Sequence, residues 1–370
     1  MSSPQSHPAP ATALVLTGGG ARAAYQVGVL QALARLHRGS GPAARANPFP
    51  IISGSSAGAI NAAALACGAD DFGGAVRRIA RVWAGLEGAQ IYRADALSVL
   101  SSSDTPWARV LSAGWMIARW RRTGLHSLLD ISPLRLLLEK LVPLNRLPGL
   151  IDQGHLGALA VSASSYNSGA HVTFYQSGSW QEPWTRSNRI STPAQIGLDH
   201  LLASSAIPFV FPAAALEIGG RSEYFGDGSM RQSAPLAAAI HLGAERILAI
   251  GAGRMKEPDD ALGPNALSGY PTLAQVAGHA LSSIFLDALT ADVERLERVN
   301  ATLALIPPEA RSGTPLRRVE LLVIAPSQRI DQIAARHANA LPAAVRGLLA
   351  EPAVPTDAAH QQGSALASYL

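Results

Sequence analysis

Residues 50–61 read PIISGSSAGAIN and change abruptly from a strand pattern to a helix pattern. The glycine and serine cluster between the two patterns fits G-x-S-x-G from Gly54 to Gly58, with Ser56 at its centre. A sharp turn from strand to helix can lift the central serine out of the fold, and only small neighbours avoid a clash there. The first helical N–H groups would face any negative charge that develops near Ser56. The alternative is that the turn only packs a helix closely against a sheet.

The patterns around this turn alternate between strand and helix. An apolar run at residues 13–16 is followed by glycines and a helical pattern to residue 37, then by a strand at 50–52 and a helix at 57–66. This alternation indicates a parallel sheet with right-handed crossovers. Further strands are predicted at 158–166 and 171–178 (as a hairpin), from 222 to an Asp-Gly turn, at 246–253 and at 318–327, and further helices at 198–206 and 235–244.

The sequence TGGG at residues 17–20 ends the first strand and opens a helix. Bare N–H groups at this position can point into the crevice at the carboxyl ends of parallel strands, so the loop is a candidate oxyanion hole. The competing interpretation is a dinucleotide loop, because Gly18, Gly20 and Ala23 approximate G-x-G-x-x-G/A. The second strand ends in IISG without the acidic residue that holds a ribose, which disfavours a dinucleotide cofactor.

A serine nucleophile needs a base. Asp227 comes after the strand residues EYF, with one glycine between them, and precedes Gly228, where a carboxylate would reach the same sheet edge as Ser56. The histidines after Asp227 lie in helical patterns or near the C-terminus, and none follows a strand end: His241, His279, His337 and His360. The sequence therefore predicts a Ser-Asp dyad without histidine. The alternative is an α/β-hydrolase-type esterase that uses one of the histidines.

Three motifs together resemble those of bacterial patatin-like phospholipases: GGGARA at 18–23, GSSAG at 54–58 and DGS at 227–229. The runs LLASSAIPFVFPAA at 201–214 and APLAAAIHLGAERIL at 234–248 extend the similarity, which spans about residues 12–255. The resemblance implies a three-layer α/β/α fold with a mainly parallel central sheet. It also implies a lipid acyl hydrolase of the phospholipase A or lysophospholipase type, with a role in lipid degradation.

The resemblance assigns roles to individual residues. Ser56 would attack a lipid ester and Asp227 would accept its proton, while the oxyanion N–H groups would come from Gly18, Gly19 and Gly20, with Arg22 nearby. Two positions depart from the family pattern: Ala23 replaces a glycine, and Ser229 replaces the usual Gly or Ala. Both substitutes are small, so altered packing is expected rather than lost activity. No metal or organic cofactor is implied.

Composition excludes several other classes. The chain has 370 residues, 30 of them basic, and a net charge of +4. Because no basic stripe interleaved with aromatics stands out, no nucleic-acid partner is predicted. The single cysteine excludes an internal disulfide framework. No secretion signal and no run of about 18 apolar residues is seen, so we expect a cytoplasmic protein, with peripheral membrane attachment left open.

A tryptophan-rich segment suggests how lipid could be met. Residues 107–120 would place Trp107 and Trp115 on one helical face, with Trp120 and arginines nearby, which suits a lipid interface. The alternative is an ordinary amphipathic helix packed on the domain. The predicted organisation is a disordered leader at 1–11, one domain at 12–345 with a helical insertion at about 85–130, and a flexible tail at 346–370.

One alternative belongs to a different functional class. The chain could keep the fold and lack catalysis, as a lipid-binding or regulatory protein. Reaction of Ser56 with a fluorophosphonate probe distinguishes this alternative from an enzyme, because the probe labels an activated serine.

Overall fold

The computed structural model describes residues 11–39, 45–91, 129–179, 181–208, 210–255, 273–311, 313–328 and 330–337, and for 273–287 the backbone alone. The predicted leader, apart from Ala11, and the predicted tail lie outside these residues. So does most of the predicted insertion, with Trp107, Trp115 and Trp120. These predictions therefore stay predictions.

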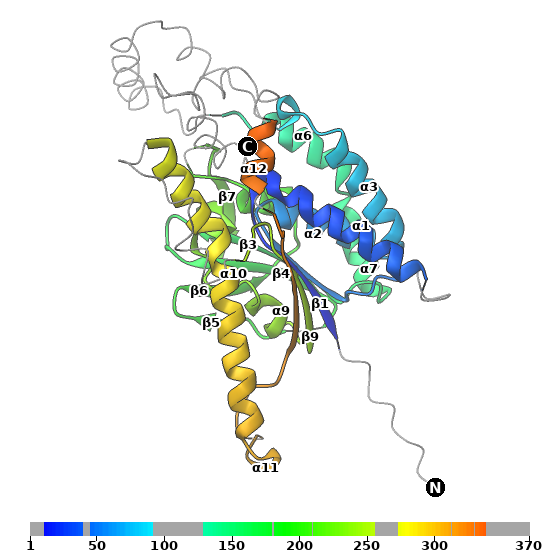
Figure 1. Ribbon diagram of the computed structural model, residues 1–370, viewed down its shortest axis with the longest axis vertical. Helices are drawn as coiled ribbons and strands as arrows, with labels where there is room; N and C mark the ends of the chain where they lie inside the picture. Colours follow the sequence, from blue (N-terminus) through cyan, green and yellow to red (C-terminus); the bar gives the residue numbers. More distant parts are fainter. Residues whose placement is uncertain are drawn as a thin grey trace, which may run out of the picture.

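The described strands form one mixed sheet (Figure 1). Its main path runs β10-β9-β1-β2-β3-β4-β6-β5, and β8 joins β3 and carries β7. The five strands from β10 to β3 pair in parallel, while β4 and β8 both run antiparallel to β3. The bounds are β1 Thr12–Leu16, β2 Ile51–Ser55, β3 Ala158–Ser165, β4 His171–Ser177, β5 Thr185–Arg186, β6 Arg189–Pro193, β7 Ala214–Ile218, β8 Arg221–Asp227, β9 Arg246–Ile250 and β10 Glu320–Ile324.

Helices cover both faces of the sheet. Their bounds are α1 Ala24–Arg38, α2 Ala57–Ala66, α3 Phe72–Ala84, α6 Ser132–Leu141, α7 Leu147–Asp152, α8 Leu198–Ser204, α9 Ala237–His241, α10 Leu273–Leu305, α11 Pro308–Arg311 and α12 Ile330–Arg336. Short 3₁₀ helices lie at η1 Gly20–Ala23, η3 Gly88–Gln90, η4 Leu144–Arg146 and η5 Gly228–Arg231. No helix among the described residues has the length and apolar character needed to cross a membrane.

Alternation along β1 separates two cores, because successive side chains of a strand point to opposite faces. Leu14 and Leu16 pack with α1, α2, α3, α6 and α7 on one face. Ala13 and Val15 pack with α9 and α10 on the other. Figure 1 shows the long α10 on the side of the sheet opposite to α1, α2 and α3. The predicted three-layer α/β/α fold with a mostly parallel sheet is confirmed.

Most predicted elements are present, with shifted ends. The helix at 57–66 is confirmed, and β3 and β4 form the predicted antiparallel hairpin. The strand predicted at 50–52 is longer, because β2 continues through the glycine and serine cluster to Ser55. Small side chains at these positions keep the strand buried between β1 and β3. Strand β7 was not predicted, since its sequence AALEI is short and pairs only with β8.

Candidate active site

The serine at the centre of the opening motif lies between β2 and α2 in a rare backbone conformation. Ser56 has φ 54° and ψ −135°, and α2 begins at the next residue. A non-glycine residue in such a region costs about 1–3 kcal/mol. Ser56 is buried, with 2 % of its surface exposed. Its backbone N–H donates a hydrogen bond to Oγ of Ser204 at 2.9 Å. The strained turn predicted from G-x-S-x-G is therefore present.

The two glycines of the motif are required by close backbone approach. A Cβ atom on Gly54 would lie 2.5 Å from the carbonyl oxygen of Gly58. A Cβ atom on Gly58 would lie 2.5 Å from the carbonyl oxygen of Thr17 and would also clash with that of Leu16. Because these obstacles are backbone atoms, they cannot move aside as a flexible side chain would. Both glycines thus let α2 pack directly against the ends of β1 and β2.

We expect Gly58→Ala to destabilise the protein by roughly 2–4 kcal/mol, because the added methyl group forces α2 away from β1. The matched control is Gly28→Ala in α1, where an added Cβ would meet no atom within 4 Å. Since alanine favours a helix over glycine, the control should be neutral or stabilise by up to about 1 kcal/mol. Urea unfolding of both variants measures the difference. Equal stability of the two variants would contradict the close packing at the turn.

Asp227 stands at the end of β8 and faces the serine. The hydroxyl of Ser56 donates to Oδ2 of Asp227 at 2.5 Å, across 171 positions of sequence. The N–H of Ser229 donates to Oδ1 at 2.8 Å, and the N–H of Asp227 donates to the carbonyl of Ala206 at 2.8 Å. Both carboxyl oxygens thus accept a hydrogen bond, and a third hydrogen bond fixes the backbone of Asp227. Ser56 and Asp227, predicted separately from the sequence, meet in the fold.

The environment of Asp227 changes its acidity. Its side chain is fully buried, and burial raises the pKa from 3.8 to about 7, against the hydrogen bonds from Ser56 and Ser229. Burial dominates because a charged carboxylate loses its hydration in the interior. A carboxylate with a pKa near neutrality is a stronger base than an exposed aspartate, and this one accepts a hydrogen bond from the hydroxyl of Ser56.

The glycine loop lies beside this pair. A Cβ atom on Gly18 would lie 3.0 Å from Cβ of Ser56 and would overlap the hydroxyl of Ser229. Gly19 packs against Ala252, and Gly20, with φ 55°, lines the same cavity as Ser56. In the described part of the chain, no hydrogen bond uses the N–H of Gly18 or Gly19 as its donor. Arg22 is 6 % exposed, and its N–H donates to the carbonyl of Gly19 at 3.1 Å.

A buried polar network that was not predicted from the sequence connects the glycine loop to the helices. Nε2 of Gln26 donates to the carbonyl of Thr17 at 2.7 Å, and Nδ2 of Asn61 donates to Oε1 of Gln26 at 3.1 Å. Nε1 of Trp83 donates to Oδ1 of Asn61 at 2.8 Å, which adds α3 to the network. Asn61 within the alanine-rich α2 is a detectable signal, because a polar side chain on a buried helix needs a partner. Ser204, which accepts from Ser56, offers no such signal.

Ser56 opens into a cavity of about 490 Å³ between α2, α3 and α6. Its wall includes apolar residues of α2 and α6, among them Ile60, Ala64 and Leu138. Four exposed basic residues also line it, namely Arg78, Arg81, Lys140 and Arg146. Within the described residues, only Arg146 of these four forms an ion pair, with Asp70 at 2.7 Å. A mostly apolar cavity with a few polar groups is typical of a site for a lipid or another apolar ligand.

The histidines predicted as alternative bases do not line this cavity where the structure describes them. No histidine of the described residues lines the cavity at Ser56. His241 stacks on Trp184, with ring centroids 4.6 Å apart, and lines a different cavity. His337 follows α12, and the side chains of His279 and His360 lie outside the described residues. Among the described residues, no three His, Cys, Asp or Glu side chains cluster as metal ligands would.

Comparison with known proteins identifies a family. A family model described as patatin-like phospholipase matches residues 14–240, which is more than half of the chain. The match lies inside the domain predicted at 12–345, whose limits stay a prediction. Comparison with curated proteins gives no significant match.

Two solved structures are similar to this chain at low identity. One is VipD from Legionella pneumophila, with a TM-score of 0.35 and 13 % identity over 98 % of this chain and 66 % of VipD. The chain thus spans just under two thirds of the length of VipD. The other is full-length SpcU in complex with full-length ExoU from the type III secretion system of Pseudomonas aeruginosa. Its TM-score is 0.29, with 15 % identity over 97 % of this chain and 76 % of the matched chain.

Proposed function

The chain belongs to the patatin-like phospholipase family, and from that premise we propose that it hydrolyses carboxylic esters of lipids with Ser56 as nucleophile and Asp227 as base. The single observation that carries the proposal is the 2.5 Å hydrogen bond from Oγ of Ser56 to Oδ2 of Asp227. This contact joins a serine in a strained turn to a buried carboxyl group whose pKa is raised to about 7. Nucleophile and base within hydrogen-bonding distance are the signature of an activated serine.

The proposed reaction has two halves. Oγ of Ser56 attacks the ester carbonyl carbon while its proton passes to Oδ2 of Asp227. The tetrahedral intermediate then collapses, and the leaving alcohol takes the proton back from Asp227 as the acyl-enzyme forms. In the second half, water gives a proton to Asp227 and attacks the acyl carbon. The acid is released, and the proton returns to Ser56.

Negative charge on the carbonyl oxygen needs hydrogen-bond donors in both halves. The N–H groups of Gly18, Gly19 and Gly20 are proposed for this role, because Gly18 lies against Ser56 and Gly20 lines its cavity. The start of α2 adds the positive end of a helix dipole near the same oxygen. Preorganised donors of this kind contribute about 3–4 kcal/mol each to the stability of the transition state.

The cavity supports an acyl lipid as substrate. Its lining follows α2 from Ala57 to Ala64, so an acyl chain bound at Ser56 could lie along the helix among apolar side chains. Arg78, Arg81 and Lys140 are exposed and could attract a phosphate group outside the apolar part. A phospholipid or lysophospholipid combines these two features. We therefore infer that the chemical class of substrate is a phospholipid with at least one ester-linked acyl chain.

Filling the cavity should change the preferred chain length. Ala64 lies eight residues after Ser56, which is about 12 Å along a helix axis, and lines the cavity. Ala64→Leu should lower kcat/KM at least about tenfold for a long acyl ester, because one large side chain displaces part of the chain. Hydrolysis of the acetate ester should stay within about threefold. A series of p-nitrophenyl esters measures both.

The control for this substitution is Ala64→Ser, which hardly changes volume and should keep the parent's chain-length profile. If long and short esters lose activity equally in Ala64→Leu, the acyl chain does not lie along α2. An unchanged profile in Ala64→Leu would lead to the same conclusion.

The proposed function is tested by assaying purified protein on phospholipids, lysophospholipids, acylglycerols and short p-nitrophenyl esters. We expect release of free acid from at least one lipid class, and none from the Ser56→Ala variant. A folded protein that hydrolyses none of these esters and does not react with a fluorophosphonate probe would contradict the proposal. It would favour the lipid-binding or regulatory alternative.

A further inference from the structure

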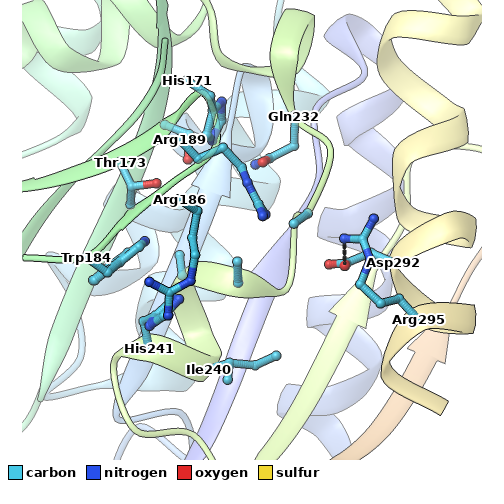
Figure 2. A pocket seen from close by; sticks show the side chains of 14 residues that line it. His171, Thr173, Trp184, Arg186, Arg189, Gln232, Ile240, His241, Asp292 and Arg295 are labelled. Atoms are coloured by element: carbon cyan, nitrogen blue, oxygen red, sulfur yellow. Dashed lines mark hydrogen bonds and ion pairs between the residues drawn. The ribbon is translucent and has the colours of Figure 1, made fainter. Parts of the chain in front are cut away.

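A second cavity, of about 170 Å³, lies on the face of the sheet covered by α9 and α10. It shares no lining residue with the cavity at Ser56. Figure 2 shows its labelled side chains, which come from β4, β5 and the residue before it, β6, α9, α10 and the segment after η5. The proposed hydrolysis of lipid esters does not use this cavity, so its residues need a separate explanation.

The cavity has an excess of positive charge. Arg186, Arg189 and Arg295 line it, together with a single carboxylate, Asp292. Figure 2 shows Arg189 extending from the β6 side into the space between the sheet and α10. His171 and His241 also line the cavity, and burial lowers the pKa of each to about 4, so both rings are neutral at pH 7. Three guanidinium groups and one carboxylate therefore leave a net charge of about +2. In the described part of the chain, neither Arg186 nor Arg189 has a carboxylate partner within salt-bridge distance.

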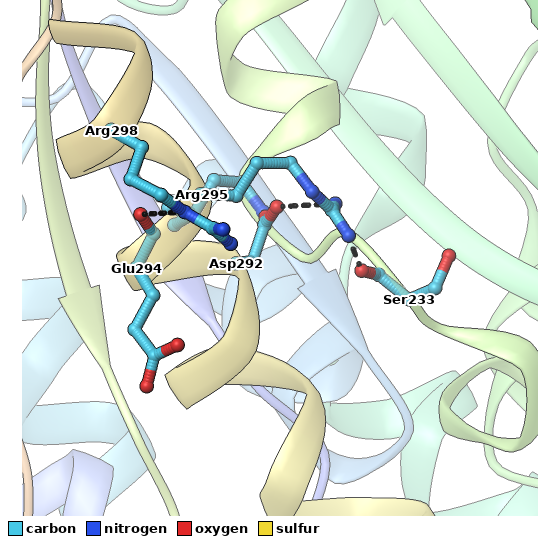
Figure 3. A network of polar contacts seen from close by, with 6 residues as sticks. Ser233, Asp292, Glu294, Arg295 and Arg298 are labelled. Carbon is cyan, nitrogen blue, oxygen red and sulfur yellow. Dashed lines mark hydrogen bonds and ion pairs between the residues drawn. The ribbon is translucent and has the colours of Figure 1, made fainter.

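The one carboxylate is already engaged (Figure 3). Asp292 is 6 % exposed and accepts from the N–H of Leu236 at 2.9 Å and from Nη1 of Arg295 at 3.0 Å. Nη1 of Arg295 also reaches the carbonyl of Ser233 at 3.3 Å. These contacts hold α10 against the chain that follows η5. They leave Arg186 and Arg189 as the charges available to a ligand.

A buried imidazole lines the cavity with one nitrogen unsatisfied. His171 is 3 % exposed, and its Nδ1 has no hydrogen-bond partner among the described residues. Burial, with Arg189 nearby, lowers the pKa of His171 to about 4, so the ring is neutral at pH 7. Among the described residues, Arg186 donates only to the carbonyl of Thr185, at 2.8 Å, and has no carboxylate partner. An unpaired buried imidazole nitrogen in a cavity with two guanidinium groups that lack a carboxylate indicates a missing polar ligand.

The rest of the cavity wall suits a small polar group, and the cavity is too small for an extended ligand. Thr173 and Gln232 line it as neutral hydrogen-bonding side chains. Trp184 and His241 stack at 4.6 Å between ring centroids and form a rigid aromatic side. Arginine is suited to phosphate because its planar guanidinium group donates two parallel hydrogen bonds to oxyanions. A phosphate dianion balances two positive charges, whereas a carboxylate would leave one uncompensated.

We propose that this cavity is a second binding site, separate from the ester-hydrolysing site, and that it takes a phosphate group between Arg186 and Arg189 with His171 beside it. The phosphate can be free in solution or belong to a lipid headgroup, since both present the same oxygens. The site lies on the opposite face of the sheet from the cavity at Ser56.

The test titrates inorganic phosphate into the full chain by isothermal calorimetry and measures sedimentation with vesicles. One vesicle preparation is phosphatidylcholine alone, and the other adds phosphatidic acid, which carries a phosphomonoester. We expect one of two results. Saturable binding of inorganic phosphate identifies a free phosphate as the ligand. Binding to the vesicles that contain phosphatidic acid, and not to inorganic phosphate or to phosphatidylcholine vesicles, identifies a lipid headgroup. Arg189→Gln should weaken that binding at least about tenfold, because hydrogen bonds to charged groups are strong.

Controls make the result specific. Arg221→Gln removes an exposed arginine at the start of β8, outside the cavity, and should bind like the parent. Ser56→Ala should also bind like the parent, so failure of the hydrolase proposal leaves this test intact. Arg186→Gln, at an exposed position, serves as a second variant if Arg189→Gln does not fold. Absence of binding to both probes, or binding unchanged in the folded variants at Arg186 and Arg189, would overturn the proposal.

Discussion

Replacing Ser56 by alanine is expected to reduce ester hydrolysis by at least about 1,000-fold, because the nucleophile of the proposed acyl-enzyme is removed. Asp227→Asn should reduce it to a similar extent, since an amide cannot accept the proton that Ser56 releases. The two side chains act as one unit through the 2.5 Å bond between them. We therefore expect the double variant to be no slower than the slower single variant.

The matched control for these substitutions is Ser53→Ala. Ser53 lies in β2, three residues before the nucleophile, is 4 % exposed, and its hydroxyl has no partner among the described residues. Its removal should leave kcat/KM within about threefold of the parent. Steady-state kinetics on a p-nitrophenyl ester, with circular dichroism to verify folding, measures all four variants. Activity above one tenth of the parent in either dyad variant would exclude the proposed mechanism.

The same aspartate should also produce a large dependence of stability on pH. Because burial raises the pKa of Asp227 from 3.8 to about 7, the folded state holds its proton more tightly than the unfolded state. The penalty for ionising the buried carboxyl is absent below about pH 4, grows between pH 4 and 7, and is complete above pH 7. Its upper limit is about 4 kcal/mol, from 1.36 kcal/mol per pKa unit.

Asp227→Asn removes this ionisation. Relative to the parent, the variant should therefore gain up to about 4 kcal/mol in free energy of unfolding between pH 4 and 8. The change with pH is the quantity to compare, because any loss of hydrogen bonding in the asparagine variant is independent of pH. Ser56→Ala should behave in the opposite way, since it removes a donor that lowers the pKa of Asp227. If the free energy of unfolding, measured with urea, changes with pH in the same way for Asp227→Asn and the parent, burial does not raise the pKa of Asp227.

Features that depend on neighbouring residues could be predicted from the sequence, whereas contacts between residues far apart in the sequence could not. The turn at Ser56 was readable because G-x-S-x-G between a strand and a helix allows few conformations. Asp227 was readable because it ends a strand just before a glycine. The contact between Ser204 and the N–H of Ser56 was not readable, because the two residues are 148 positions apart and serine is common on helices.

The second cavity, lined by Arg186 and Arg189, could not be predicted from the sequence for the same reason. Arg186 and Arg189 are near each other in the sequence, but Arg295 and His171 are brought to them only by the packing of α10 and β4. Charge composition alone gave a net charge of +4 and no sign of where positive charge gathers. The network of Gln26, Asn61 and Trp83 likewise depends on three helices meeting around the glycine loop.

The central claim is that Asp227 activates Ser56, and the rate of fluorophosphonate labelling as a function of pH tests it most directly. We predict a single adduct on Ser56, found by peptide mass mapping. Its rate should rise about tenfold per pH unit below pH 7 and level off above it, as Asp227 loses its proton, with a pKa of about 7. Asp227→Asn should remove both the fast reaction and its pH dependence. No labelling of the folded parent, an adduct on another serine, or an unchanged rate in Asp227→Asn would contradict the claim.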